Sequence, residues 1–295
     1  MLLPWAWVDG RIVPRTSKAI RTDDRAVLYG WGAFETLRVY AGLPFDLEPH
    51  LARMRPTAKM LGIRADLSAS RMRRAIARLL RANRVRGDVG LRITLTGGPV
   101  GGLPTLFLHA RTLEPSPDML RARGIRLCLA PWRRVTSAPL RGHKTLNYLD
   151  HMIARAHARR RRADEAVYAD PEGRLLEGTL SSLFVVRSGT ILTPPIDRGI
   201  LPGITRARVV RIIRSLRLPI GERQIALRDL RACDEAFITS STNEVLPVAS
   251  FDGRPLRRGL LWQRIWSRYR EQVAAACSRA GSASPGHAHR REGLR

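Results

Sequence analysis

Gly142-His143-Lys144-Thr145-Leu146-Asn147-Tyr148-Leu149 is the stretch from which the fold and the function of this 295-residue chain are best argued. The chain holds 52 lysine and arginine residues, of which only Lys18, Lys59 and Lys144 are lysines. Arginine stays protonated at any working pH, whereas a desolvated lysine can lose its proton and become a nucleophilic amine. Lys144 is therefore either a lysine that the arginine-rich composition retained by chance or a reactive residue. The neighbouring sequence distinguishes these two possibilities.

The segments after Lys144 predict a large unit of strands and helices. Leu149, Met152, Ile153 and Ala156 have the spacing of one helical face, so a helix follows Lys144. Short apolar runs predict strands at 125–130, 166–169, 183–187, 190–193, 236–239 and 245–248, with helices after Thr205 and over 260–276. We expect this unit to span 124–277 and to be followed by a disordered basic tail, 278–295.

The segments before Lys144 predict a smaller α+β unit over 1–113. Asp9-Gly10 supplies the turn of a hairpin, 23–32 and the glycine-rich 97–102 are expected as loops, and prolines mark a linker over 114–123. Strands are expected at 34–40, 89–96 and 105–109, and helices over 51–61 and 72–80. Arg38 shares a strand face with Phe34, Thr36 and Tyr40, where it either lines a pocket or is solvated.

Composition favours a soluble globular protein. Apolar residues make up 44% of the chain and charged residues 26%, and no apolar run approaches the roughly 20 residues of a membrane span. The first residues lack a basic leader, so no signal peptide is predicted. Cys128, Cys233 and Cys277 are scattered and odd in number, which predicts neither a disulfide framework nor a metal site and suits the cytoplasm.

The net charge of +27 raises the hypothesis of nucleic-acid binding. The arginines are, however, spread along the whole chain, except for Arg159-Arg160-Arg161-Arg162 at the end of a predicted helix, where cations complement the helix dipole. No nucleic-acid motif is present, and aromatic residues make up only 6% of the chain. We therefore predict a solvated basic surface rather than a nucleic-acid partner.

Three features of the larger unit match the needs of one cofactor. Lys144 is a candidate imine-forming lysine, and Glu177 is an acid followed by glycine, expected between two strands. Gly203-Ile204-Thr205 opens a helix whose free N–H groups attract an anion, and Ser240–Asn243 is a turn rich in hydroxyls. Pyridoxal 5'-phosphate needs such a lysine, such phosphate-binding turns and a carboxylate that pairs with its pyridine nitrogen.

The chain resembles the class IV pyridoxal-phosphate aminotransferases, the fold-type IV group. This group includes branched-chain aminotransferases, D-amino acid aminotransferases and aminodeoxychorismate lyase. The resemblance covers roughly residues 5 to 275. It rests on Tyr29-Gly30, Phe34–Arg38, His50–Arg53, Lys144–Leu149, Asp164–Ala166, Glu177-Gly178, Leu201–Arg206, Asp234–Ala236 and Ser240–Pro247, in this order.

The resemblance implies a role for each matching residue. Lys144 would bind the cofactor covalently, and Glu177 would pair with the pyridine nitrogen. Phosphate binding would fall to Arg53, Gly203, Ile204, Thr205, Ser241 and Thr242, with Leu201 packed on the ring and Tyr148 near its edge. It also implies a smaller N-terminal α+β domain, a larger barrel-like C-terminal domain, a cofactor between them, and a homodimer.

Departures from the family pattern concern the substrate. Ser182 stands where many relatives have asparagine, and Trp31 where many have aspartate. Many D-amino acid enzymes and lyases carry arginine where this chain has Thr96. The substrate carboxylate is then expected at Tyr29, Arg38 or Arg92.

We therefore predict an aminotransferase that moves an amino group between a branched-chain-like amino acid and a 2-oxo acid. The first alternative is 4-amino-4-deoxychorismate lyase on the same scaffold. This alternative is favoured because the stretch His143–Asn147 lacks the extra glycine that is common in branched-chain enzymes. A more distant alternative is a basic binding protein without catalytic activity.

Overall fold

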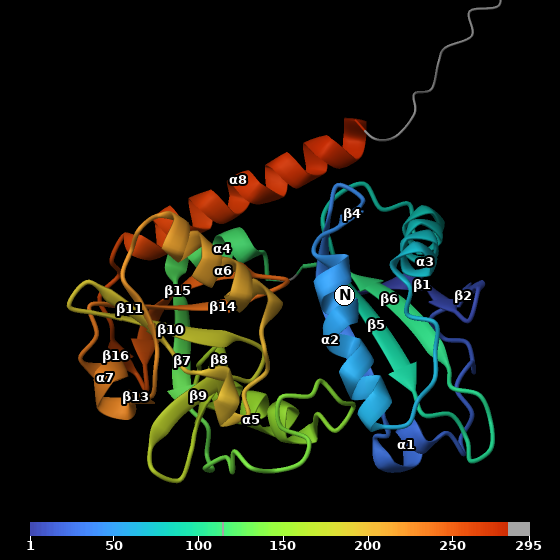
Figure 1. Cartoon of the computed structure of the whole chain (residues 1–295), viewed down its shortest axis with the longest axis horizontal. Coiled ribbons are helices and arrows are strands. Elements are labelled where there is room, and N and C mark those ends of the chain that lie inside the picture. Colours follow the sequence, from blue (N-terminus) through green and yellow to red (C-terminus); the bar gives the residue numbers. More distant parts are fainter. Residues whose placement is uncertain (114, 283–295) are drawn as a thin grey trace, which may run out of the picture.

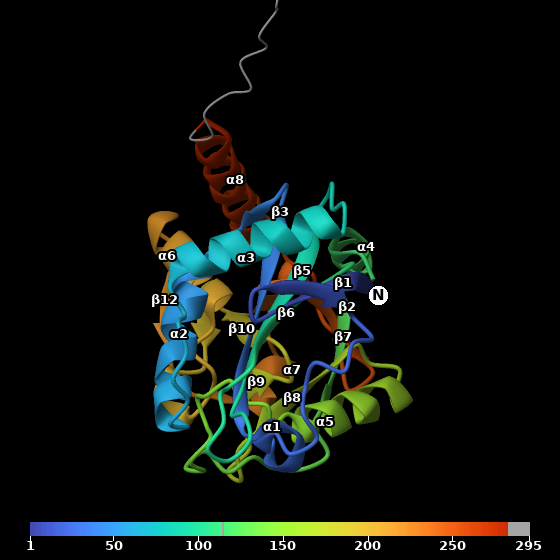
Figure 2. The ribbon, with the colours of Figure 1, turned by 90° about the vertical axis from the view of Figure 1, so that its right-hand side faces the viewer.

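A computed structural model describes residues 1–113 and 115–282, and its strands form two sheets (Figure 1). The first sheet is antiparallel, with the strand order β2-β1-β6-β5-β3-β4. Its strands are β1 (Leu2–Val8), β2 (Arg11–Pro14), β3 (Gly32–Tyr40), β4 (Leu43–Pro44), β5 (Val89–Thr96) and β6 (Leu106–Arg111). Helices α2 (Leu47–Met60) and α3 (Ala69–Ala82) share an apolar core with Leu37, Leu91 and Leu108 of this sheet. Figure 2 shows α3 across the face that is turned away from the second sheet.

Two local features of the first sheet follow directly from glycine positions. Asp9 and Gly10 have φ values of 42° and 97°, which confirms the predicted two-residue hairpin turn between β1 and β2. Gly32 begins β3 so close to β5 that a Cβ atom would lie 2.5 Å from the carbonyl oxygen of Leu95. The same Cβ atom would lie 2.6 Å from Cδ1 of Leu146, so glycine at this position allows β3 to lie beside the segment that carries Lys144.

The second sheet mixes parallel and antiparallel pairs and has the strand order β12-β11-β10-β14-β15-β7-β8-β9-β13, with β16 paired to β15. Its strands are β7 (Ile125–Leu129), β8 (Glu165–Ala169), β9 (Arg174–Gly178), β10 (Ser182–Arg187), β11 (Thr190–Thr193), β12 (Ile220–Glu222), β13 (Ile225–Ala226), β14 (Glu235–Ser240), β15 (Glu244–Phe251) and β16 (Arg254–Pro255). Strands β9 and β10 are distant in this order, yet only Thr179–Ser181 connects them. The sheet must therefore curl. This arrangement agrees with the predicted mixed fold class.

The remaining helices pack around the second sheet. They are α4 (Pro117–Arg123), α5 (Leu149–Arg160), α6 (Ile204–Ser215), α7 (Leu227–Arg231) and α8 (Leu261–Ser282), with a 3-10 turn at Ile196–Arg198. Helices α6 and α8 form a core with β10 and β14 that also takes in Tyr40 and Phe45 from the first unit. The two sheets are thus joined by packing as well as by the chain.

Three sequence-based expectations need correction. Residues 25–29, expected in a loop, form helix α1 (Arg25–Tyr29), because Asp24 caps the N–H of Ala26 and Gly30 closes the helix in the left-handed conformation. Within the expected linker, 117–123 form α4, whose Leu120 is buried in the core of the second sheet. Helix α8 continues to Ser282, so 278–282 of the expected tail are helical, and 283–295 lie outside the described residues.

The domain boundaries at 113 and 124 remain a prediction. Along the sequence, all strands of the first sheet precede this segment and all strands of the second sheet follow it. Among the described helices, none combines the length and the apolar character that a bilayer span requires.

Candidate active site

A cavity of about 710 Å³ opens between the two sheets. Its lining includes Phe34 and Arg92 from the first sheet, Lys144 from the segment ahead of α5, and Glu177 and Thr239 from the second sheet. Cavities of this volume are typical of sites for small molecules and cofactors. Every predicted cofactor-binding residue lines it, whereas two of the three predicted substrate residues do not.

Lys144 is held in the cavity by its own backbone. The carbonyl of Lys144 accepts from the N–H of Phe34 (3.0 Å), and Thr145 forms a bridge with Ala33, so this stretch extends the edge of β3. The Nζ atom lies 4.5 Å from the ring centre of Phe34 and 5.4 Å from that of Tyr148. Burial, together with the nearby charge of Arg53, lowers the pKa of Lys144 to about 8. A sizeable fraction of this amine is therefore neutral near pH 8.

Glu177 lies at the end of β9, rather than between strands as the sequence suggested. Its Oε1 accepts from Nη1 of Arg134 (2.9 Å), and its Oε2 accepts from the backbone N–H of Leu201 (3.0 Å). Burial raises the pKa of Glu177, and the charge of Arg134 and the N–H of Leu201 act against this shift. The glutamate is thus fixed in place by two donors from two different segments.

Tyr148 and His151 form a stacked pair beside Glu177. Their ring centres are 4.1 Å apart and nearly parallel, with an interplanar angle of 5°. The carbonyl oxygen of Thr179 accepts from the hydroxyl of Tyr148 (2.9 Å) and lies 2.9 Å from Nδ1 of His151. Burial and the charge of Arg134 lower the pKa of His151 to about 4. His151 is therefore neutral at physiological pH, with the proton on Nδ1 and Nε2 facing Nη2 of Arg134 at 3.2 Å.

Arg53 reaches the cavity from α2, where a buried carboxylate orients it. Its Nε and Nη2 donate to the two oxygens of Glu35 (2.8 and 2.7 Å), and Nδ1 of His50 lies 2.7 Å from Oε2 of the same residue. Burial alone would raise the pKa of Glu35, but Arg53 and His50 outweigh it and hold this pKa at about 2. The bidentate pairing fixes the plane of the guanidinium, whose Nη1 donates to the carbonyl of Pro202 (2.9 Å).

The N-terminus of α6 lies beside Arg53 and leaves its N–H groups uncapped. The N-cap residue is Gly203, and no side chain caps the helix. A Cβ atom on Gly203 would lie 2.7 Å from Oγ of Ser182, so glycine is required by the close approach. The hydroxyl of Thr205 lies 3.4 Å from that of Ser241, and Ile204 and Thr242 complete this part of the lining. Together with Arg53, this group provides the donors that an anion such as a phosphate requires.

Three arginines, Arg92, Arg111 and Arg155, lie on the opposite side of the cavity. Arg92 stacks on Phe34, with its guanidinium carbon 3.6 Å from the ring centre, and burial lowers its pKa to about 10. Burial and the neighbouring Arg155 lower the pKa of Arg111. Within the part of the chain that the structure describes, none of these three arginines has a carboxylate within 4.0 Å. This side therefore suits an anion that arrives with a ligand.

Tyr29 does not reach the cavity. It lies on α1 with 66% of its surface exposed, and it is absent from the cavity lining. The sequence places it near the glycine that begins β3, but helix α1 turns its side chain outward. The structure therefore does not bring Tyr29 to the cavity of its own chain, and the expectation that it meets a substrate carboxylate stays a prediction.

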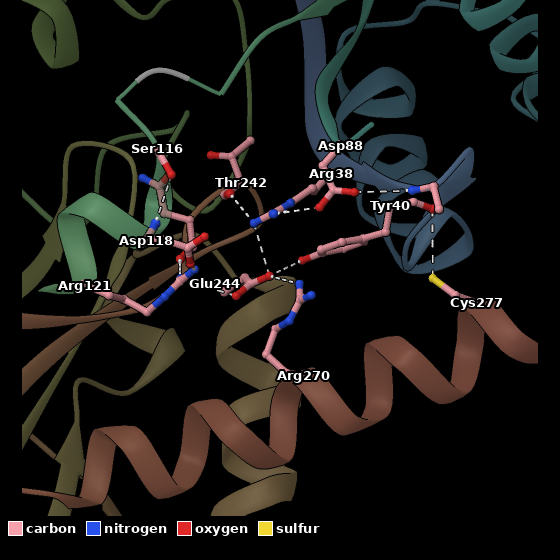
Figure 3. A network of polar contacts seen from close by, with 12 residues as sticks. Arg38, Tyr40, Asp88, Ser116, Asp118, Arg121, Thr242, Glu244, Arg270 and Cys277 are labelled. Carbon is pink, nitrogen blue, oxygen red and sulfur yellow. Dashed lines mark hydrogen bonds and ion pairs between the residues drawn. The ribbon is translucent and has the colours of Figure 1, made fainter. Parts of the chain in front are cut away.

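Arg38 is neither in the cavity nor solvated, which corrects both alternatives considered for it. It is buried against Glu244 and Asp88, to which its Nη1 and Nη2 donate at 3.1 and 2.7 Å (Figure 3). Its Nη1 also lies 3.3 Å from the carbonyl of Thr242. The alternation of side chains along β3 correctly predicted the face on which Arg38 lies. The end of that face packs against α8 and does not reach the cavity.

Sequence reasoning missed Arg134, His151 and the roles of Glu35 and His50. Arg134 precedes Lys144 by ten positions in a proline-rich segment without periodicity, so nothing in the local pattern distinguishes it from other arginines. Glu35 and His50 stand within segments that carry the family resemblance, which was the available signal for them.

Several known proteins resemble this chain in sequence and in fold. The family model for amino-transferase class IV matches residues 32–251. The D-alanine aminotransferase of Bacillus licheniformis is 30% identical over 259 residues, covering 85% of this chain and 89% of that protein. The aminodeoxychorismate lyase of Bacillus subtilis is 28% identical over 255 residues, covering 83% and 86%. The crystal structure of the branched-chain aminotransferase from Thermoproteus uzoniensis with norvaline superposes with a TM-score of 0.82 at 31% identity, covering 92% and 94%.

Proposed function

This chain belongs to the class IV amino-transferase family, and we propose that it transfers an amino group between an amino acid and a 2-oxo acid. One observation carries the proposal. Lys144, with its pKa lowered to about 8, lies in the same cavity as Glu177 and the uncapped N-terminus of α6. These are the three groups that pyridoxal 5'-phosphate, the cofactor of this family, requires.

The residues of the cavity fit this cofactor. We name as the cofactor wall the side formed by Arg53, Glu177, Arg134, the N-terminus of α6 and the turn Ser240–Asn243. The phosphate would be held by Arg53, Ile204, Thr205, Ser241 and Thr242, and the pyridine nitrogen would face Glu177. Thr239 also lines the cavity, and no partner for its buried hydroxyl lies among the described residues. An unpaired buried hydroxyl of this kind indicates a polar ligand.

Each residue then has a physical task. When bound, the cofactor supplies an electron sink that stabilises negative charge at the α-carbon of the substrate. Glu177, fixed by Arg134 and Leu201, would hold a proton at the pyridine nitrogen. Tyr148 and Leu201, which both line the cavity, would pack against the ring. Nζ of Lys144, neutral in part near pH 8, accepts the proton from the α-carbon and returns it during the transfer.

The substrate is proposed to bind along the opposite side, which we name the substrate wall: Phe34, Arg92, His109, Arg111 and Arg155. Arg92 is the predicted substrate residue that lines the cavity, and it orients a carboxylate by charge and hydrogen bonding. Apolar lining from Leu2, Leu113 and Met152 favours an aliphatic side chain, such as that of a branched-chain amino acid. The additional arginines favour a dicarboxylic partner in the second half-reaction.

A lyase acting on 4-amino-4-deoxychorismate is the second candidate. It is supported by the likeness to the Bacillus subtilis lyase and by a substrate wall suited to a substrate with two carboxylates. Product analysis separates the two activities. A lyase releases pyruvate from aminodeoxychorismate without an amino acceptor, whereas an aminotransferase consumes a 2-oxo acid in proportion to the amino acid it forms. Incubation with a panel of amino donors and 2-oxo acids, and separately with aminodeoxychorismate alone, is the deciding experiment.

We further propose that the chain works as a homodimer in the cytoplasm. Helices α1 and α5 expose the apolar residues Val27, Leu28, Leu149, Met152 and Ile153 beside the cavity. The two helices are linked, because the side chain of Asn147 donates to the carbonyl of Gly30 (3.1 Å). Exposed apolar side chains on two helices linked in this way support an interface between subunits. Light scattering of the cofactor-loaded protein tests this, and a mass of about one chain at all concentrations would contradict it.

A further inference from the structure

Glu244 is a buried carboxylate outside the cavity that collects donors from three parts of the chain. It is fully buried at the first position of β15 and has a φ value of 61°, in the left-handed region that few residues other than glycine adopt. Its Oε1 accepts from Nη1 of Arg38 (3.1 Å), the hydroxyl of Tyr40 (2.9 Å) and Nη1 of Arg270 (2.8 Å). Its Oε2 accepts from Nε1 of Trp266 (2.7 Å) and lies 3.3 Å from Nη1 of Arg121.

The donors connect elements that are distant in sequence (Figure 3). Arg38 and Tyr40 belong to β3 of the first sheet, Arg121 belongs to α4, and Trp266 and Arg270 belong to α8. Burial would raise the pKa of Glu244, but Arg38 and the other arginines outweigh it and lower this pKa, so the carboxylate is ionised. A single negative charge thus holds the first sheet, α4 and α8 together at one point.

The same arginines also hold the backbone of the proposed phosphate-binding turn. Nη1 of Arg38 donates to the carbonyl of Thr242 (3.3 Å), and Nη1 of Arg121 donates to the carbonyl of Asn243 (3.1 Å). Neither arginine lines the cavity, whereas Thr242 and Asn243 do. The two carbonyls are therefore held by arginines that lie outside the cavity, while the residues of the turn line it.

Strand β3 couples this network to the other phosphate-binding group. Glu35, three positions before Arg38 on β3, fixes Arg53 at the cavity. Through Arg38, the same strand is tied to Glu244 and to the Ser240–Asn243 turn. The position of β3 thus sets both Arg53 and the turn, which come from different units of the chain.

We propose that Glu244 is a positioning residue for the cofactor phosphate: it fixes Arg38 and Arg121, and through them the backbone of the turn Ser240–Asn243. This inference rests on the proposed function, because it takes the turn to bind the phosphate. It assigns to Glu244 no contact with cofactor or substrate. Replacing Glu244 should therefore weaken the binding only of a ligand that carries the phosphate group. A residue that only stabilised the fold would affect ligands with and without phosphate alike.

The test compares two ligands on the full-length apoprotein. Dissociation constants for pyridoxal 5'-phosphate and for pyridoxal, which lacks the phosphate, are measured by absorbance and tryptophan fluorescence for the wild type and for Glu244→Gln. The variant keeps the size of the side chain and removes its charge. We expect binding of pyridoxal 5'-phosphate to weaken by about three- to thirtyfold, the range of couplings transmitted through packed polar networks. Binding of pyridoxal should change by less than about twofold.

Glu235→Gln is the matched control. Glu235 is also buried on a neighbouring strand of the second sheet, but it accepts from the N–H groups of Leu261 and Trp262 at the start of α8 and does not line the cavity. It should lower the melting temperature without changing the ratio of the two dissociation constants. An equal loss of affinity for both ligands in Glu244→Gln, or no loss for either, would overturn the inference.

A second variant and the wild-type protein itself provide two further measurements. If Glu244→Gln does not fold, Arg121→Met is measured in the same way, because it removes the contact with the carbonyl of Asn243 and keeps Glu244. An unchanged ratio in that variant overturns the proposal. A wild-type protein that binds both ligands equally well would instead contradict the proposed function, since no phosphate site would then exist at the turn.

Discussion

The cofactor wall and the substrate wall differ in how their charges are paired. On the cofactor wall, Arg53 is held by Glu35 and Arg134 by Glu177, each at hydrogen-bond distance. These pairs are buried and are formed by residues of the chain alone. Groups fixed in this way lose little entropy on binding and present a constant geometry, which suits a ligand that stays bound through many turnovers.

On the substrate wall, the arginines form no ion pairs within the part of the chain that the structure describes. Arg92 is stacked on Phe34, and Arg111 lies near Arg155, with no carboxylate within 4.0 Å of these arginines among residues 1–113 and 115–282. Desolvated like charges repel each other until an anion neutralises them. On the cofactor wall, the arginines are paired with carboxylates of the chain. On the substrate wall, the arginines are left for an anionic substrate to neutralise. This difference defines what each of the following substitutions should change.

Lys144→Ala should have the largest effect, because this residue serves both ligands. Loss of the nucleophilic amine and of the proton carrier should reduce amino transfer by at least about 10⁴-fold. The visible absorption band of the cofactor-loaded protein should also disappear. Steady-state assays and absorbance spectra measure both effects. Lys59→Ala, at an exposed lysine, is the control, and activity of Lys144→Ala within tenfold of that control would contradict the assignment.

Arg53→Met should break the cofactor wall alone. Charge-assisted hydrogen bonds contribute roughly 1.5–3 kcal/mol, so the dissociation constant of pyridoxal 5'-phosphate should rise by about 10- to 150-fold. Saturating cofactor should restore much of the activity. Arg55→Met, two positions later on α2, removes a half-exposed arginine paired with Glu48 and should leave cofactor affinity unchanged. Equal losses in the two variants would indicate general damage to α2.

Arg92→Met should break the substrate wall alone. We expect kcat/KM for a dicarboxylic substrate to fall by about 10- to 100-fold, the effect of losing one charge-assisted contact, while cofactor affinity stays within twofold. Arg71→Met is the matched control, because Arg71 also stacks on an aromatic ring, that of Trp7, outside the cavity. A loss of cofactor affinity in Arg92→Met would show that the two walls are not separate.

The smallest expected effect is the lowered pKa of Lys144 in the wild-type apoprotein. Its pKa is lowered to about 8, so the amine is protonated and unreactive below this pH and becomes nucleophilic above it. Competitive labelling with an amine reagent, read by mass spectrometry, should show labelling of Lys144 rising with a midpoint near pH 8. The exposed Lys18 and Lys59 provide internal references in the same sample. A midpoint shared by all three lysines would contradict the electrostatic argument.

The sequence was informative where chemistry depends on a rare residue or on a short contiguous motif. Lys144 stood out because the chain otherwise uses arginine, and the turn before α6 is contiguous in sequence. The hairpin at Asp9-Gly10 was equally local, since a two-residue turn demands positive φ values. These features could be predicted because their physical cause lies within a few residues.

The sequence was uninformative where partners come from distant segments. The face of β3 that holds Arg38 was identified from its alternation, but its partner Glu244 lies 206 positions away. Arg134 pairs with Glu177 across 43 positions and has no local signature. The exposed position of Tyr29 depends on a five-residue helix, α1, which the sequence did not predict. Long-range pairing depends on how the two units meet, which no local pattern encodes.

The central claim is that Lys144 binds the cofactor in this cavity, and chemical trapping tests it most directly. The cofactor-loaded protein is reduced with borohydride and digested, and the modified peptide is identified by mass spectrometry. With only three lysines in the chain, the outcome is unambiguous. We predict one phosphopyridoxyl group per chain, on Lys144. Modification of Lys18 or Lys59 instead, or no modification, would contradict the account.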